Sequence, residues 1–324
     1  MVTTRKPFSR FMLKFYMAPS LPPSLRVIVR GWLNCNQVVM LSASDNVLVD
    51  SGYCSHREQT LERLAGPEGL DGEPLERLIN THCHSDHMGG NAAVASAHGC
   101  TITIPAGEAK HIEPWTPQTA WMEEFDQRAD PFHFDATIAA GEAFEGGGLT
   151  WQVHAAPGHD MDALMFFEPT HRILISGDAL WENGMGFVWP GEGPNPFIEA
   201  AQATLTAIER LDPALVIPGH GKPFPGTVDA IARVRARLDG YARDPAKNAR
   251  HVIKVMFVFA LLDRGRMAIA DIPAYLGRIG CYRHMAEQFL GRSPESLAEW
   301  LVGDLARSGA VTVADGLLEP ALAA

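Results

Sequence analysis

Three histidines and one aspartate occupy six positions of this chain, residues 82–87, in the order His-Cys-His-Ser-Asp-His, and two glycines follow at positions 89 and 90. Histidine is otherwise sparse, with 13 in 324 residues. The preceding segment, Leu75–Asn80, is short and apolar, which predicts a strand that runs directly into this stretch. Any fold of this chain must therefore accommodate several imidazoles and a carboxylate at one strand end.

The spacing of these side chains predicts a metal site. Side chains two residues apart in an extended segment point to the same side, so His82 and His84 can reach one ion. A turn after them directs Asp86 and His87 to a neighbouring position. Mixed imidazole and carboxylate ligands suit zinc, iron or manganese. Cys83, which alternates with the two histidines, is expected to point away from the ion and to be buried.

Three further motifs downstream have a similar composition. Each places a histidine or an aspartate beside glycine at a predicted strand end or turn: Gly158-His159-Asp160, Gly177-Asp178 and Gly219-His220-Gly221. Glycine lets the backbone bend sharply there and leaves room beside an ion. Isolated histidines elsewhere are interpreted as surface or hydrogen-bonded core residues, but packing alone does not account for four such motifs in one chain.

In this order, and together with Asp50-Ser51-Gly52, the motifs resemble the signature of the metallo-β-lactamase superfamily over roughly residues 25–225. The resemblance implies an α/β fold, an αββα sandwich in which two mixed β-sheets are flanked by helices, with the site at one edge. It also implies two divalent metal ions, most often zinc, with iron or manganese as alternatives.

The resemblance also implies a role for each matching residue. The first metal is expected on His82, His84 and His159, the second on Asp86, His87 and His220, and Asp178 is expected to bridge the two. Asp50 is expected to orient a histidine ligand from behind. The aspartates at 86 and 178 are similar to those of the binuclear hydrolases, such as hydroxyacylglutathione hydrolase, so lactam cleavage is disfavoured.

Two cations held close together acidify a water between them, and the resulting hydroxide attacks an electrophilic carbon or phosphorus. Asp86 and Asp178 are the expected catalytic residues, and we expect Asp86 to orient the water or to accept its proton. The predicted activity is metal-dependent hydrolysis of a small ester or thioester. Because loops and added domains set the substrate within such a family, a phosphodiesterase or ribonuclease and a lactonase are alternatives.

Five aromatic residues flank the metal motifs in the sequence: Trp115, Trp121, Trp181, Phe187 and Trp189. They are candidates for the lining of an apolar acyl pocket. Aromatic side chains in loops serve equally often as plain packing, so the sequence leaves both interpretations open.

Composition shifts divide the chain into an N-terminal extension (1–24), a catalytic domain (25–245) and a C-terminal domain (246–324). Helices are predicted at 57–65, 91–98, 198–211, 226–242, 252–262 and 294–308. Late in the chain, helices followed by two short strands around Asp315-Gly316 indicate a winged-helix-like order. The apolar segment Val252–Leu262 is expected to be buried against the catalytic domain or against a second chain in a homodimer.

Charge is distributed unevenly along the chain, whose net charge is −11. Nine Lys and Arg face eight Asp and Glu from residue 246 onward, against 18 and 30 before it. The acidic catalytic domain disfavours a nucleic-acid substrate. Residues 246–292, with eight Lys and Arg against three Asp and Glu, are the candidate for a basic patch. We favour a small-molecule substrate and interpret these residues as a solvated helix face.

The five cysteines are scattered and contain no Cys-x-x-Cys pair. This distribution is typical of reduced thiols in a cytoplasmic protein. No window approaches the roughly 18 apolar residues of a membrane span. The apolar run Phe11–Met17 is interrupted by Lys14 and is followed by no Ala-x-Ala site, so we do not interpret it as a signal peptide.

Overall fold

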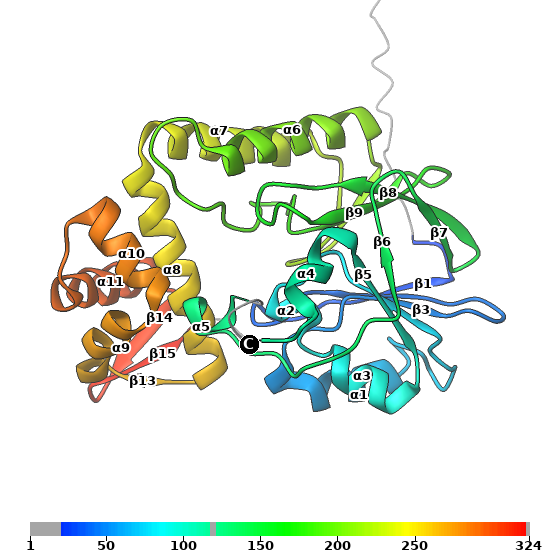
Figure 1. Ribbon diagram of the computed structural model, residues 1–324, viewed down its shortest axis with the longest axis horizontal. Helices are drawn as coiled ribbons and strands as arrows, with labels where there is room; N and C mark the ends of the chain where they lie inside the picture. Colours follow the sequence, from blue (N-terminus) through cyan, green and yellow to red (C-terminus); the bar gives the residue numbers. More distant parts are fainter. Residues whose placement is uncertain (1–20, 117–120, 322–324) are drawn as a thin grey trace, which may run out of the picture.

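The computed structural model describes residues 21–116 and 121–321. The predicted N-terminal extension, with its apolar run, lies outside the described residues except for residues 21–24. Two β-sheets stack on each other (Figure 1). The first contains, in spatial order, β1 (Leu25–Ile28), β2 (Gln37–Met40), β3 (Val47–Val49), β4 (Arg77–Ile79), β5 (Thr101–Pro105) and β6 (Ala136–Ile138). Its β3–β4–β5–β6 pairings are parallel and its first two pairings are antiparallel.

The second sheet is also mixed. Its spatial order is β12 (Phe224–Pro225), β11 (Leu215–Pro218), β10 (Ile173–Gly177), β9 (Leu164–Glu168), β8 (Leu149–Ala155) and β7 (Ala143–Gly146). Only the β10–β11 pairing is parallel. Apolar residues of both sheets, including Met40, Trp151 and Phe166, form the core between them. Each of these three side chains is fully buried.

Helices cover the outer face of each sheet (Figure 1). The first sheet packs against α1 (Arg57–Ala65) and α3 (Asn91–His98), through residues such as Leu64 and Val94. The second packs against α6 (Pro196–Leu211) and α7 (Val228–Arg243) through Leu205 and Val234. Short helical turns connect the larger elements: η1 (Cys54–His56), α2 (Ser85–Met88), η2 (Ala106–Glu108), α4 (Ala109–Ile112) and α5 (Met122–Phe125). The predicted αββα sandwich is confirmed.

The C-terminal region begins with α8 (Pro245–Arg264), which runs beside the sandwich (Figure 1). After it come β13 (Met267–Ala268), η3 (Ile269–Asp271), α9 (Ile272–Arg278), α10 (Gly280–Met285), the π-helical turn η4 (Ala286–Leu290), α11 (Pro294–Ser308), β14 (Val311–Ala314) and β15 (Leu317–Pro320). The β14–β15 hairpin turns at Asp315 and Gly316, which both have positive φ, as a tight two-residue hairpin turn requires.

Several helices have the predicted bounds, but α8 does not. Helices α1, α3 and α11 begin and end where the sequence pattern places them. Helix α8 begins seven residues before the predicted start at Val252, because Asp244 caps it. The Asp244 carboxylate accepts a hydrogen bond of 2.9 Å from the Lys247 amide, and Pro245 occupies the first turn. Strand β7 and helix α10 were not predicted, since both are too short to show a clear period.

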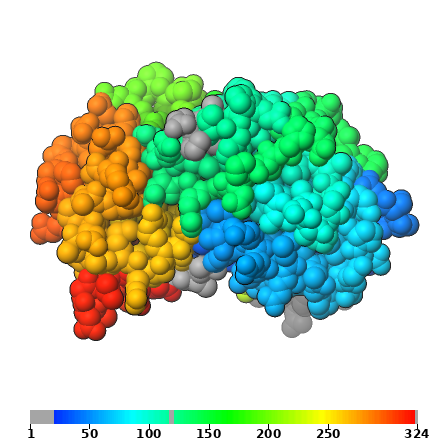
Figure 2. Space-filling view, turned by 60° about the horizontal axis from the view of Figure 1, so that its bottom comes forward, coloured from blue at the N-terminus to red at the C-terminus, as the bar shows by residue number. Residues whose placement is uncertain are grey.

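The apolar side chains of α8 are buried within this chain. Val252, Ile253 and Phe257 pack against α9, α10 and α11. Phe259, on another side of the helix, contacts Tyr53 of the sandwich with their ring centroids 5.2 Å apart. Figure 2 shows the C-terminal region, yellow to red, packed along the sandwich. Among the described residues, none of the helices is both long and apolar enough to cross a membrane.

We expect Phe257→Ala to destabilise the protein strongly. Phe257 is 0% exposed in the core of the C-terminal region, and truncating such a residue costs about 3–5 kcal/mol. Val313→Ala is the matched control because Val313 is 50% exposed and surface changes usually stay within about 0.5 kcal/mol. Urea denaturation measures both, and equal midpoints for the two variants would contradict the assignment of this core.

Candidate metal centre

The predicted ligands meet where strands of both sheets end. Asp50 follows β3 and His82 follows β4, which are parallel neighbours in the first sheet. Asp178 follows β10 and His220 follows β11, the parallel pair of the second sheet. Parallel neighbours end at the same sheet edge. The stacking of the two sheets therefore brings four segments, far apart in the sequence, to one place.

A first cluster consists of His82, His84 and His159, with one ring nitrogen from each within 4.8 Å of the others. His84 Nδ1 and His159 Nε2 lie 2.8 Å apart. His82 Nε2 is buried and has no hydrogen-bond partner. Burial, reinforced by the neighbouring imidazoles, holds the pKa of His82 well below its ordinary value. A neutral imidazole with a buried, unused nitrogen suits a bound cation.

A second cluster consists of Asp86, His87, Asp178 and His220, again with one ligand atom each within 4.8 Å of the others. Helix α2 presents Asp86 and His87. His220 Nε2 lies 3.0 Å and His87 Nε2 3.7 Å from Asp86 Oδ2. His87 Nε2 is buried and forms no hydrogen bond. These atoms form a second set of oxygen and nitrogen donors suited to a divalent cation.

Asp178 lies between the two clusters. Its Oδ1 is 3.3 Å from His87 Nε2 in the second cluster, and its Oδ2 is 3.5 Å from His159 Nε2 in the first. Burial works to raise the pKa of this carboxyl group, but the adjacent His87 and His220 hold the pKa well below its ordinary value. The side chain therefore presents one oxygen of an anion to each cluster, which is the arrangement a bridging ligand needs.

Asp50 orients His87 by a hydrogen bond to the ring nitrogen Nδ1. Its Oδ2 lies 2.8 Å from His87 Nδ1, and the Thr81 backbone amide and hydroxyl each donate to the same carboxylate at 2.8 Å. A proton on Nδ1 leaves the Nε2 lone pair directed at the second cluster. Cys35 lies close to the same pair, but burial raises the pKa of its thiol to about 11, which keeps it neutral.

The structure adds residues that the sequence analysis did not assign. Asp160 Oδ2 lies 3.5 Å from His84 Nε2, and its position next to His159 was a usable signal. Burial and the adjacent Asp160 raise the pKa of the buried Glu108 well above its ordinary value. Trp32 stacks on His220 with ring centroids 5.7 Å apart. No sequence pattern marks Glu108 or Trp32.

A cavity of about 560 Å³ opens over both clusters. Four of the five predicted aromatic residues line it: Trp121, Trp181, Phe187 and Trp189. The Trp181 indole donates to Asp178 Oδ1 at 3.2 Å. The His159 Nδ1 atom lies 2.5 Å from the Phe187 carbonyl oxygen, which orients its Nε2 toward the first cluster. Two of the four, Trp181 and Phe187, thus contact the ligands themselves. Cys83 is buried, as expected.

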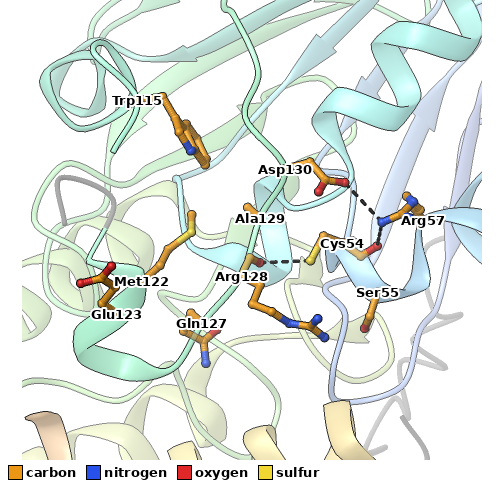
Figure 3. A pocket seen from close by; sticks show the side chains of 10 residues that line it. All are labelled: Cys54, Ser55, Arg57, Trp115, Met122, Glu123, Gln127, Arg128, Ala129 and Asp130. Atoms are coloured by element: carbon orange, nitrogen blue, oxygen red, sulfur yellow. Dashed lines mark hydrogen bonds and ion pairs between the residues drawn. The ribbon is translucent and has the colours of Figure 1, made fainter. Parts of the chain in front are cut away.

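Trp115 does not line this cavity, contrary to the prediction. Its ring packs edge-on against Phe132, with centroids 5.7 Å apart, at the rim of the core beneath the first sheet. It lines a separate cavity of about 420 Å³, shown in Figure 3, together with residues such as Arg57 and Arg128. Met122 and Gln127 line both cavities, which are therefore neighbours. Trp115 was assigned to the cavity over the ligands because it is close to the metal motifs in the sequence, but it lines the neighbouring one.

Comparison with known families agrees with this geometry. Residues 30–220 match the family described as the metallo-beta-lactamase superfamily. The chain belongs to this superfamily. Its membership accords with the predicted enzyme class, a metal-dependent hydrolase, and every residue of the two clusters lies inside the matched range.

The chain is also similar to individual members of this superfamily. It is 27% identical to a hydroxyacylglutathione hydrolase of Rhodospirillum rubrum over 250 residues, 76% of this chain and 83% of that protein. It is 32% identical to one of Hyphomonas neptunium over 117 residues, 36% of this chain and 38% of that protein. For that protein and for those of Idiomarina loihiensis and Methylococcus capsulatus, the match spans only 38, 49 and 53% of the relative's length.

Solved structures share the fold. A beta-lactamase domain protein from Burkholderia ambifaria matches with a TM-score of 0.57 at 20% identity, over 97% of this chain and 98% of that one. A metallo-beta-lactamase family protein from Thermus thermophilus matches with a TM-score of 0.53 at 19% identity, over 93% of this chain and 100% of that one. Because these matches extend over nearly the whole chain, they include most of the C-terminal region.

We expect Asp50→Asn to weaken metal binding. The change removes the charge that fixes the His87 tautomer, and loss of such a supporting contact costs about 10- to 100-fold in metal affinity. Competition with a chromophoric chelator measures the affinity. Asp71→Asn is the matched control, because Asp71 is an exposed residue away from the site. An unchanged affinity in Asp50→Asn would show that Asp50 does not position His87.

Gly219→Ala is expected to disturb the second cluster. A Cβ at this position would overlap the Asp178 carboxylate and lie 3.0 Å from His87 Cε1. Overpacking of this kind costs about 1–3 kcal/mol, or about 5- to 150-fold in metal affinity. Metal content by mass spectrometry is the readout. Gly66→Ala, where the nearest atom would be 3.5 Å away, is the control, and equal metal content in both variants would contradict the prediction.

Proposed function

We propose that this protein is a dinuclear metal-dependent hydrolase of small esters or thioesters. The observation that carries the proposal is the position of Asp178 between two clusters of ligand atoms, at the base of a cavity with an aromatic lining. His82, His84 and His159 would hold one divalent cation, and Asp86, His87 and His220 the other, with Asp178 contacting both. Zinc is our first choice for such a His and Asp ligand set, with iron and manganese as alternatives.

Two bound cations would supply an acidified water as nucleophile and would polarise the carbonyl that it attacks. The chain's own residues then orient the reaction. Asp86 lines the cavity and directs Oδ2 between His220 and His87, so we assign to it the orientation of the attacking water and the acceptance of its proton. The Trp181 indole, which donates to Asp178, restrains the shared carboxylate.

Two observations favour the ester or thioester over a phosphodiester. The relatives named hydroxyacylglutathione hydrolase carry the name of thioester hydrolases. None of the described residues that line the cavity is Lys or Arg. A polyanionic substrate would therefore find no Lys or Arg partner among these lining residues.

The compartment is part of the same proposal. All five cysteines lie among the described residues, and each is buried as a free thiol. Free thiols that form no disulfide are typical of a reducing compartment. We therefore propose that the protein is cytoplasmic. Thiol titration of protein purified without reductant would test whether its five cysteines are reduced, the property on which this proposal rests.

The decisive experiment combines metal analysis with a substrate panel. We expect about two zinc, iron or manganese ions per chain, loss of activity on chelation, and turnover of acyl thioesters or esters in preference to lactones and bis-p-nitrophenyl phosphate. Turnover of the phosphodiester alone would overturn the proposal.

Asp86→Ala tests the assigned catalytic role. Removal of a positioned proton acceptor lowers kcat/KM by about 10²- to 10⁴-fold. Asp239→Ala is the control, because Asp239 is exposed on α7. Metal content is measured in parallel, and an Asp86→Ala protein with full metal content and full turnover would exclude a catalytic role for Asp86.

A further inference from the structure

An unbroken series of rings leads from the first metal cluster to the C-terminal region. His159 contacts Phe187 with centroids 5.0 Å apart, and Phe187 lies 6.4 Å from Phe125. Phe125 contacts Trp189 at 5.5 Å, and Trp189 stacks on His284 at 5.6 Å. All five residues line the cavity over the metal centre. An acyl chain whose carbonyl lies at the clusters would therefore meet a series of ring faces and edges along this path.

The C-terminal region supplies the opposing wall. Val255, Met256 and Phe259 of α8 line the same cavity. Residues 255 and 259 are four apart, so their side chains share one face of the helix. The contact between Phe259 and Tyr53 holds that face against the sandwich. Helix α8 therefore adds three apolar side chains to the lining of the cavity.

The charged groups in this cavity carry one sign. Among the described residues that line it, Lys and Arg are absent, whereas Glu124, Asp160 and Asp162 are present. The nearby Lys110 is paired with Asp162 at 3.1 Å and is 64% exposed. An anionic group on the substrate would thus lose its hydration without gaining a cationic partner beyond the metal centre, which is costly. An uncharged apolar group incurs no such cost.

We propose that the substrate is an ester or thioester with an uncharged, apolar acyl group that lies between the ring series and the α8 wall. Acyl groups that end in a carboxylate are excluded by the same surface. This inference rests on the proposed hydrolase function and adds the substrate class to it. It assigns the choice of substrate to Val255, Met256 and Phe259, which are not metal ligands.

Three thioesters of N-acetylcysteamine, whose thiol is uncharged, test the substrate class on the metal-loaded full chain. Acetyl, hexanoyl and adipoyl thioesters are compared, because adipoyl has the length of hexanoyl and a terminal carboxylate. We expect kcat/KM to rise from acetyl to hexanoyl by up to about fourfold per methylene, and to fall from hexanoyl to adipoyl by at least about tenfold. An adipoyl thioester hydrolysed as fast as the hexanoyl thioester would overturn the inference.

Val255→Lys tests the wall directly. Val255 is only partly buried, so a lysine there can direct its ammonium group into the cavity. We expect the ratio of adipoyl to hexanoyl turnover to rise at least about tenfold. Val228→Lys, which adds the same charge at a position that is 80% exposed on α7, should leave the ratio unchanged. An unchanged ratio in a folded Val255→Lys protein would contradict the assigned wall.

Phe259→Trp is the second variant. The larger ring should shorten the cavity and reduce the preference for hexanoyl over acetyl, and an unaltered preference would also count against the assigned wall.

A binding measurement separates failure of the inference from failure of the hydrolase proposal. Hexanamide and adipamic acid are the amide counterparts of the two acyl groups. Each is added to the protein, and its binding is measured by the change in tryptophan fluorescence, to which Trp121, Trp181 and Trp189 in the cavity contribute. Tighter binding of hexanamide supports the substrate class even if no thioester is hydrolysed, in which case only the hydrolase proposal fails. Equal or tighter binding of adipamic acid overturns the substrate class whatever the protein hydrolyses.

Discussion

The position of the Asp178 carboxylate depends on both halves of the sandwich at once. Asp178 follows β10 of the second sheet, yet one of its oxygens faces His87, which lies on α2 after β4 of the first sheet. The other oxygen faces His159 of its own half. A buried carboxylate without cationic or imidazole partners would destabilise the fold by several kcal/mol. The two ligand clusters therefore form only when the two sheets are packed against each other.

The C-terminal region completes the lining of the cavity above the metal ligands. The sandwich holds all seven candidate ligands, but it supplies only part of the cavity above them. Helix α8 and His284 of α10 close the remaining side, and the loop after α5 is tied to α8, with Arg128 donating to Asp263 at 2.6 Å and Arg264 to Asp126 at 2.6 Å. Under the proposed function, this division would place the chemistry in the shared fold and the choice of substrate in the added region.

Much of the candidate site was predictable because its residues lie in compact motifs. Adjacent glycines and a short apolar strand mark His82 and His220 in any sequence of this kind, and a local Ser293 cap begins α11. Glu108 and Trp32 were not predictable, since they reach the site only through the packing of distant segments. Trp115 was assigned to the wrong cavity for the same reason, because neighbours in the sequence can face opposite sides of a loop.

The sequence alone determined the kind of ligands and their order, because imidazole and carboxylate chemistry at strand ends depends on residue type and local spacing. The αββα class followed from the resemblance of these motifs to the metallo-β-lactamase superfamily. The tertiary structure decided which oxygen of Asp178 faces which cluster, which aromatic side chains line the cavity, and that no described lining residue carries a permanent positive charge. These properties arise where segments far apart in the sequence come into contact, and no local pattern encodes the distances between them.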